Sequence, residues 1–247
     1  MTGNWDFYAI SVDDKPASIF VDLGIELRAP LDTLPYLAYV KLFMNTPRSD
    51  GLSSSDEFDI LVEIEAAIEK QLCGEFVEYV GRNTSGGCRE FYFYVASPAG
   101  WGDKVAQVIA PFLGYRFETG FRDDPDWSFY QHFLRPNPIE RQRIENRRVC
   151  EALERHGDKL VSAREIDHWC YFPDVASADA FLADVEALGF QLRRKALLDD
   201  GPSRHGLQVF RIDVPSESEI DAVTLPIYEA ALRHGGEYDG WECRVEA

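Results

Sequence analysis

The stretch Glu237-Tyr238-Asp239-Gly240-Trp241-Glu242-Cys243 completes the order of strands and helices that decides the fold of this chain. It reads as a terminal strand entered through an Asp-Gly turn, and we predict a strand over residues 237–245. Working backwards, strand-like runs occur at residues 165–172, 190–198 and 207–214, with one amphipathic helix after the first run and another after the third. The resulting order, βαββαβ, predicts a ferredoxin-like α+β domain with an antiparallel four-stranded sheet and both helices on one face.

The ends of these two helices carry their own sequence signals. Ser177 is expected to cap the first helix, and Gly189 is expected to end it. Ser216 and Glu219 have the spacing of a capping box at the start of the second helix. The turn-rich residues 199–203 are expected to join the two middle strands.

The first half of the chain repeats the same order, with a hairpin before it and an extra strand after it. The expected hairpin strands are residues 5–12 and 17–23, and the later strands are expected at 36–44, 76–84, 88–96, 115–121 and 127–134. One helix is expected after Ser54, boxed by Glu57 and with Phe58 facing inward, and a second from Asp103. The run 123–127 is interpreted as a solvated turn. We therefore predict a second ferredoxin-like domain with an extra N-terminal hairpin.

The two halves meet near Pro136-Asn137-Pro138. A length of 247 residues suits two domains of ordinary size, and we expect an N-terminal domain at 1–136 and a C-terminal domain at 137–247. The second domain begins with residues 139–155, where arginines alternate with glutamates. That alternation predicts a solvated helix held by ion pairs one turn apart, with a thin apolar stripe.

Composition limits the classes of function. The net charge is −18 and both halves are acidic, which disfavours binding to phosphate backbones and favours basic protein partners. The start of the chain lacks the features of a signal peptide, and no run is long enough for a membrane helix, so we expect a cytoplasmic protein. Five cysteines without a CxxC pair indicate reduced thiols.

No motif indicates a catalytic centre, a cofactor or a metal site. The glycine-rich residues 81–87 lack the Lys-Ser/Thr ending of a phosphate-binding loop and are better explained as a hairpin turn. His168 and Cys170 share one face of a predicted strand, and with His205 or Cys243 they offer a metal-site alternative. Buried structural residues remain the favoured interpretation, since residues 166 and 172 on that face are also apolar.

The opposite face of the same strand carries Asp167, Trp169 and Tyr171. Three interpretations stand for these side chains: packing against the other domain or the hairpin, a protein-binding face, and stacking of RNA bases. The basic-aromatic consensus of RNA-recognition domains is missing. We therefore expect no direct binding of nucleic acid.

Several ordered motifs carry a resemblance to known families. The C-terminal half resembles the bacterial RraB-type protein regulators of ribonuclease E on four motifs: the charged helix ending in Arg155-His156-Gly157-Asp158, the His-containing strand 166–172, the Leu188-Gly189-Phe190 step, and Tyr238-Asp239-Gly240-Trp241. The N-terminal half resembles the domain of unknown function 695 on Trp5-Asp6-Phe7-Tyr8, Asp50-Gly51-Leu52 and Trp127-Ser128-Phe129-Tyr130. The latter brings no assigned chemistry.

The first resemblance implies a non-enzymatic protein that binds ribonuclease E, or a related basic RNA-processing protein, and inhibits it. The candidate protein-binding residues are Trp169, Tyr171, Tyr238, Asp239 and Trp241. The family's long acidic C-terminal tail is missing after Ala247, which leaves room for a different partner. The alternative hypothesis is a small-molecule-binding or enzymatic N-terminal domain, which a deep pocket with converging polar groups would favour.

Overall fold

The computed structural model describes residues 3–198, 201–202 and 204–246. The chain forms two compact units, Met1–Asn137 and Pro138–Ala247. Each unit has its own antiparallel sheet and its own hydrophobic core.

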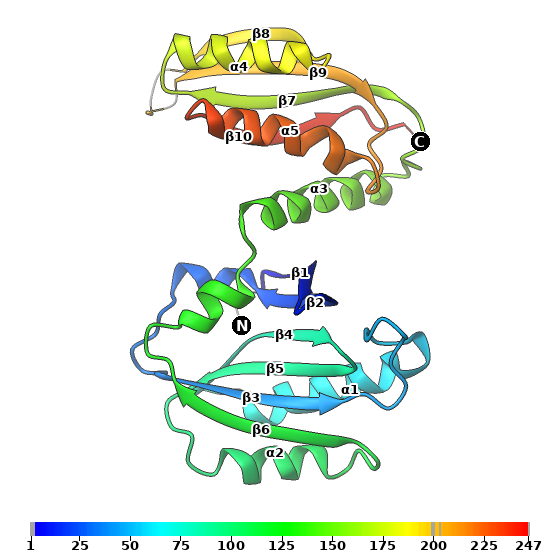
Figure 1. Ribbon diagram of the computed structural model, residues 1–247, viewed down its shortest axis with the longest axis vertical. Helices are drawn as coiled ribbons and strands as arrows, with labels where there is room; N and C mark the ends of the chain where they lie inside the picture. Colours follow the sequence, from blue (N-terminus) through cyan, green and yellow to red (C-terminus); the bar gives the residue numbers. More distant parts are fainter. Residues whose placement is uncertain (1–2, 199–200, 203, 247) are drawn as a thin grey trace. The chain divides into compact units, whose positions relative to one another are not determined.

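The N-terminal unit is a six-stranded sheet in the order β1-β2-β4-β5-β3-β6 (Figure 1). Its strands are β1 (Trp5–Val12), β2 (Lys15–Asp22), β3 (Tyr36–Phe43), β4 (Val77–Ser85), β5 (Cys88–Val95) and β6 (Arg116–Asp123), and its α-helices are α1 (Ser55–Leu72) and α2 (Trp101–Ile109). The segment from β3 to β6 has the predicted βαββαβ order, and the β1–β2 hairpin extends the sheet beside β4. The ferredoxin-like prediction with an N-terminal hairpin is therefore confirmed.

The segment after β6 is helical, so the strand predicted at 127–134 is wrong. It contains the short helix η2 (Tyr130–Leu134). Asp124 is buried, and its carboxylate accepts hydrogen bonds from the Tyr94 hydroxyl and from the backbone amides of Ser128 and Phe129. These bonds hold the chain in a helical conformation. The turn expected at 123–127 is present at the exposed residues Pro125 and Asp126, but Asp124 and Trp127 are buried rather than solvated.

Helix α1 differs from prediction at two points. Ser54 occupies the N-cap position without a side-chain cap bond, and Glu57 instead accepts the backbone amides of Asn45 and Thr46, each at 2.7 Å. Glu57 therefore joins the helix to the end of β3 rather than closing a capping box. Phe58 is 48% exposed, contrary to the inward orientation predicted for it.

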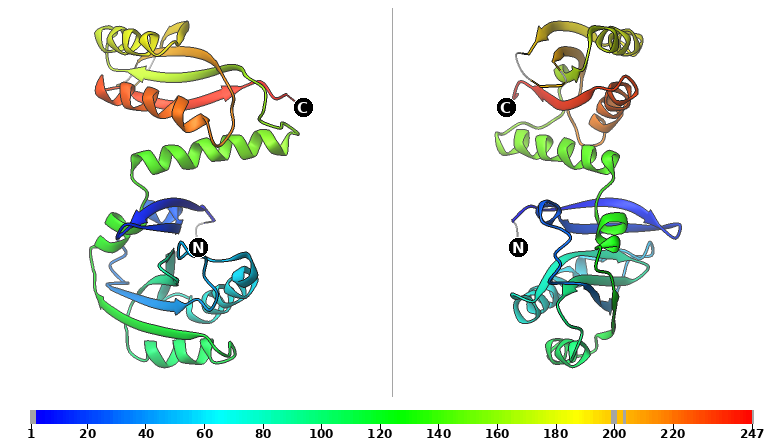
Figure 2. Two further views of the ribbon diagram at one scale, coloured as in Figure 1. Left: turned by 45° about the vertical axis from the view of Figure 1, so that its right-hand side comes forward. Right: turned by 90° about the vertical axis from the view of Figure 1, so that its left-hand side faces the viewer.

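The C-terminal unit is a four-stranded sheet in the order β10-β7-β9-β8, as predicted for a ferredoxin-like domain (Figures 1 and 2). Its strands are β7 (Arg164–Phe172), β8 (Gln191–Leu197), β9 (His205–Asp213) and β10 (Glu237–Cys243), and its helices are α3 (Pro138–Arg155), α4 (Val175–Ala187) and α5 (Ile220–Arg233). Helices α4 and α5 pack on the same face of the sheet. The buried residues of this unit form one core beneath them.

The helix starts of this unit correct two predicted caps. Asp174, not Ser177, caps α4, because its carboxylate accepts the backbone amide of Ser177 at 2.8 Å. Helix α5 begins at Ile220, and Glu219 stands at its cap position without a side-chain cap bond. Gly189 follows α4 at a positive φ of 88°, as expected for a residue that ends a helix. The predicted turn at 199–203 lies partly outside the described residues.

Helix α3 is present as predicted, but it is not wholly solvated, because one of its polar side chains is buried against α5 and β10. Its Asn146 side chain is 1% exposed, and its amide nitrogen donates to Asp221 Oδ1 and Thr224 Oγ1 at 2.7 Å each. Asn146 Oδ1 accepts Trp241 Nε1 at 3.0 Å and Gln142 Nε2 at 2.9 Å. One buried amide therefore ties α3 to α5 and to β10.

Replacing this amide should destabilise the C-terminal unit. Asn146→Ala leaves buried donors and acceptors without partners, and we expect a loss of about 2–3 kcal/mol in the free energy of unfolding of this unit. Hydrogen exchange of α3 and β10 in the full chain measures it. Glu145→Ala, at an exposed ion pair on the same helix, is the control and should change stability by less than about 1 kcal/mol. Equal exchange rates in the two variants would contradict the role of Asn146 in tying α3 to α5 and β10.

Candidate protein-binding face

The face of the C-terminal sheet opposite α4 and α5 carries an aromatic pair. Trp169 and Tyr171 are half-buried on alternate positions of β7, opposite Gln208 and Gly206 of β9. Tyr171 lies against Gly206, since a β-carbon on that glycine would come within 3.2 Å of the ring. Together with residues of β8 and its C-terminal flank, these side chains line a hollow of about 140 Å³. The hollow is small and mostly apolar, which suits a side chain from a partner rather than a buried small molecule.

An acidic region adjoins the aromatic pair on the same face. Asp167 of β7 stands directly opposite Glu242 of β10 in the strand register. Asp167 is held by Arg193 and by Gln208, whose amide donates to it at 3.0 Å. Glu242 is exposed and has no hydrogen-bond or ion-pair partner among the described side chains. Of the two facing carboxylates, Glu242 therefore has no positively charged partner among the described side chains.

Arg193 links the acidic and aromatic parts of this face. Its guanidinium pairs with Glu165 at 2.7 Å and lies over the Phe210 ring at 4.0 Å from the centroid. The acidic region also borders a hollow of about 570 Å³, which is lined by Arg164, Glu165, Asp167, Glu242, Cys243, Arg244 and Glu246. Sequence analysis missed Arg193, Glu242 and Gly206. The strand register places Glu242 opposite Asp167 and Gly206 opposite Tyr171, and the ion pair with Asp167 places Arg193, at the irregularity of β8, on this face.

The five candidate residues from the sequence divide between the two faces of the sheet. Trp169 and Tyr171 lie on the open face, and Asp239 is exposed where the β10 register shifts. Tyr238 and Trp241 instead belong to the helix-covered side: Trp241 is 7% exposed within the core, and Tyr238 packs against it. These last two residues are therefore placed to stabilise the fold rather than to contact a partner.

His168 lies among these core residues rather than in a metal cluster. Its Nδ1 is 2.9 Å from the Tyr238 hydroxyl, and its ring meets Phe190 edge-on. Burial, reinforced by the positive charge of Arg211, lowers the pKa of His168 to about 3, so the ring is neutral near pH 7. Within the part of the chain that the structure describes, no three His, Cys, Asp or Glu side chains are grouped as metal ligands.

The cysteines are all free thiols. Burial raises the pKa of Cys150 to about 12, and burial also raises the pKa of Cys170 well above its ordinary value. Both thiols are therefore neutral near pH 7 and unsuited to act as nucleophiles.

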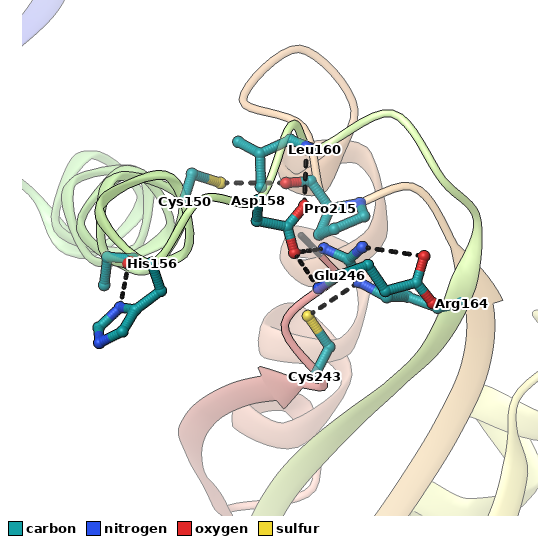
Figure 3. A network of polar contacts seen from close by, with 9 residues as sticks. Cys150, His156, Asp158, Leu160, Arg164, Pro215, Cys243 and Glu246 are labelled. Carbon is teal, nitrogen blue, oxygen red and sulfur yellow. Dashed lines mark hydrogen bonds and ion pairs between the residues drawn. The ribbon is translucent and has the colours of Figure 1, made fainter.

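A buried polar network anchors the end of β10 beside the acidic region (Figure 3). Asp158 Oδ2 accepts Arg164 Nη2 at 2.7 Å and the backbone amide of Glu246 at 2.8 Å, while Oδ1 accepts the amide of Leu160 at 2.8 Å. Arg164 Nε also lies 3.4 Å from Cys243 Sγ. The network joins the loop after α3, the start of β7 and the residues after β10, so it holds the acidic region in place.

Asp158 is charged although it is buried. Burial opposes its charge, but the amides of Glu246 and Leu160 and the Arg164 guanidinium together hold the pKa of Asp158 below its ordinary value. A lowered carboxyl pKa stabilises the folded state above the unfolded pKa of about 3.9, and the stabilisation is lost as the pH falls through the lower folded value.

The chain thus consists of two ferredoxin-like units, the second with an open, partly acidic sheet face. Residues 3–135 match the model of the Family of unknown function (DUF695), and the chain belongs to that family. Residues 143–243 match the model of the family Regulator of ribonuclease activity B. Both parts of the architecture suspected from the sequence are thus confirmed, and the second match indicates a regulator of ribonuclease activity.

Other comparisons add little. No curated protein matches the chain. Among solved structures, an unknown protein from Galdieria sulphuraria is 11% identical, with a TM-score of 0.23 over 84% of this chain and 97% of that one. A putative glycine cleavage system transcriptional repressor is 9% identical, with a TM-score of 0.24 over 85% of this chain and 98% of that one. Neither is similar enough to bear on function. No helix in the described ranges is both long and apolar enough to cross a membrane.

The Asp158 network predicts a specific response to acid. We expect Asp158→Asn to reduce the free energy of unfolding of the C-terminal unit by about 3 kcal/mol at pH 7, because it leaves Arg164 buried without its carboxylate. The deficit should shrink as the pH falls below about 4, because the Asp158 carboxylate of the unfolded wild type takes up a proton there while the folded one stays charged to a lower pH.

Urea unfolding at pH 7 and pH 3, followed by hydrogen exchange of β7 and β10, measures this difference. Asp179→Asn, which removes an exposed partner of Lys195, is the control. A deficit that stays constant between the two pH values contradicts the proposed role of the Asp158 charge.

Proposed function

We propose that this chain is a non-catalytic, cytoplasmic regulator that binds ribonuclease E, or a related basic RNA-processing protein, and inhibits it. The match of residues 143–243 to a family of ribonuclease regulators supports the class of function. One observation supports the site: an aromatic pair and two facing carboxylates lie together on a sheet face that α4 and α5 leave open. We assign binding to the domain at 137–247.

Charge favours a basic partner. Like charges directly opposite one another in a sheet are destabilising, and Arg193 compensates Asp167 but not Glu242. An arginine or lysine of a partner placed beside Glu242 relieves that repulsion. The net charge of −18 adds a long-range attraction that speeds association with basic segments and weakens as salt is added.

The aromatic pair supplies contact area beside these charges. Tryptophan and tyrosine are enriched among the residues that dominate binding energy at protein interfaces. Trp169 and Tyr171 are held in place by the β7 backbone and, for Tyr171, by contact with Gly206. A partner's guanidinium can stack on such rings while its charge meets the adjacent carboxylates.

RNA is the competing ligand for an open sheet face with aromatic side chains. Here the neighbouring carboxylates of Glu165, Asp167 and Glu242 repel phosphates, and Arg193 pairs with the first two but not with Glu242. We therefore expect no gel shift of single-stranded RNA at physiological salt. A shift that depends on Trp169 contradicts protein binding as the primary role of this face.

Direct binding to ribonuclease E tests the proposal. The purified full chain should bind the enzyme and slow its cleavage of a labelled RNA, with an affinity that falls steeply as salt rises. Binding that ignores salt, or cleavage that continues unchanged at saturation, contradicts it.

Variants of the open face locate the interaction. The double variant Trp169→Ala/Tyr171→Ala should weaken binding by about 2 kcal/mol or more, roughly thirtyfold, and Glu242→Gln by about fivefold. Leu232→Ala and Glu186→Gln, at exposed positions of α5 and α4, are the respective controls and should bind normally. Normal binding by the double variant, with its fold intact, rejects this face as the site.

A further inference from the structure

The N-terminal unit contains a groove that its fold does not fill. It lies along one flank of α1, where the strands β1, β2 and β4 extend the sheet, and it has a volume of about 430 Å³. Its lining residues are Trp5, Phe20, Val62, Glu65, Ala66, Glu69, Tyr79 and Arg82. This volume lies within the range of about 300–1,000 Å³ that is typical of small-molecule sites.

Aromatic rings form the wall on the strand side. The Trp5 ring stacks on Phe20 at 4.9 Å and lies 5.1 Å from Tyr79. Trp5 Nε1 is buried and has no hydrogen-bond partner among the described residues. Because buried donors are rarely left unbonded, this nitrogen points to a group that the described residues do not supply.

Exposed apolar side chains lie in the groove and on the elements that line it. Val62 of α1 is 44% exposed, and Phe58, one turn earlier, is 48% exposed. Phe7, which pairs with Phe20 across the hairpin, is also 48% exposed. Three large apolar side chains on two adjoining elements thus remain half in solvent, which is typical of a binding surface rather than of scattered exposure.

Among the charged groups that line the groove and that the structure describes, one carboxylate is unmatched. Glu65 accepts the Tyr79 hydroxyl and Arg82 Nε, both at 2.8 Å, and lies 3.5 Å from Arg89. Glu69, one turn later on α1, makes no hydrogen bond or ion pair with the described side chains. Burial, and then the negative charge of Glu65, raise its pKa. A half-buried carboxylate beside a like charge favours a cation as its partner.

We propose that this groove binds a small amphipathic amine. Its apolar or aromatic body packs against the side chains of Trp5 and Val62, and its ammonium group meets Glu69. A hydroxyl oxygen on the ligand accepts a hydrogen bond from the N–H of Trp5 Nε1. Carboxylate and aromatic faces together are the groups that recognise organic cations in proteins. The N-terminal unit is thereby a ligand-binding domain, a role independent of the ribonuclease proposal.

Tyramine is a suitable probe, because it combines an aromatic ring, a hydroxyl and an ammonium group. Its matched opposite is 3-(4-hydroxyphenyl)propionate, which keeps the ring and the hydroxyl but carries a negative charge. The full chain is labelled at its tryptophan indole nitrogens, and the Trp5 signal is assigned with the variant Trp5→Phe. Tyramine should shift the Trp5 indole resonance in a saturable way, and the carboxylate should leave it in place.

Variants on the exposed flank of α1 test the site without disturbing the core. Glu69→Gln should weaken tyramine binding about fivefold. Val62→Arg should abolish binding, because the arginine side chain fills the groove and its positive charge repels the ammonium group of tyramine. Glu63→Gln, an exposed position of the same helix outside the groove, should bind as the wild type does. The proposal is overturned if tyramine gives no saturable shift up to about 10 mM, if the carboxylate binds as well, or if Glu69→Gln and Glu63→Gln behave alike.

Discussion

The hydrogen bond from the Trp241 indole to the buried Asn146 amide fixes which face of β10 turns toward the core. Side chains of a strand alternate between faces, so a shift by one residue would exchange the buried and exposed sets. With Trp241 inward, Glu242 must point to the open face, where the register places it opposite Asp167. The acidic part of the proposed binding face therefore depends on a polar contact made on the other side of the sheet.

The same alternation separates two kinds of aromatic residue on neighbouring strands. Trp169 and Tyr171 share the outer face of β7, whereas Trp241 and Tyr238 face the helices. Tyr238 and Trp241 lie three positions apart and would ordinarily point in opposite directions. The irregular register between Tyr238 and Gly240, where φ is 119°, inserts one residue and turns both rings inward.

Strand and helix order could be predicted from the sequence because hydrophobic periodicity and glycine-bearing turns are local signals. Both ferredoxin-like orders followed from them, as did Gly189 at the end of α4. The errors arose where a distant partner decides the outcome. Asp124 is buried because it meets Tyr94, Glu57 caps the end of β3 rather than its own helix, and Asn146 is buried by contact with α5 and β10. Such partners have no signature in the local sequence.

The candidate site was predictable to the same extent. Trp169 and Tyr171 could be placed on one face by their spacing, but the burial of Trp241 required knowledge of the register and of Asn146. Hydroxyl-radical footprinting of the full chain, free and bound to ribonuclease E, tests the proposed face most directly. Oxidation of Trp169 and Tyr171 should fall on binding, while that of exposed side chains on the helix side, such as Leu188 after α4 and Leu232 of α5, should not change. Protection of the helix side, with Trp169 still oxidised, would contradict the account.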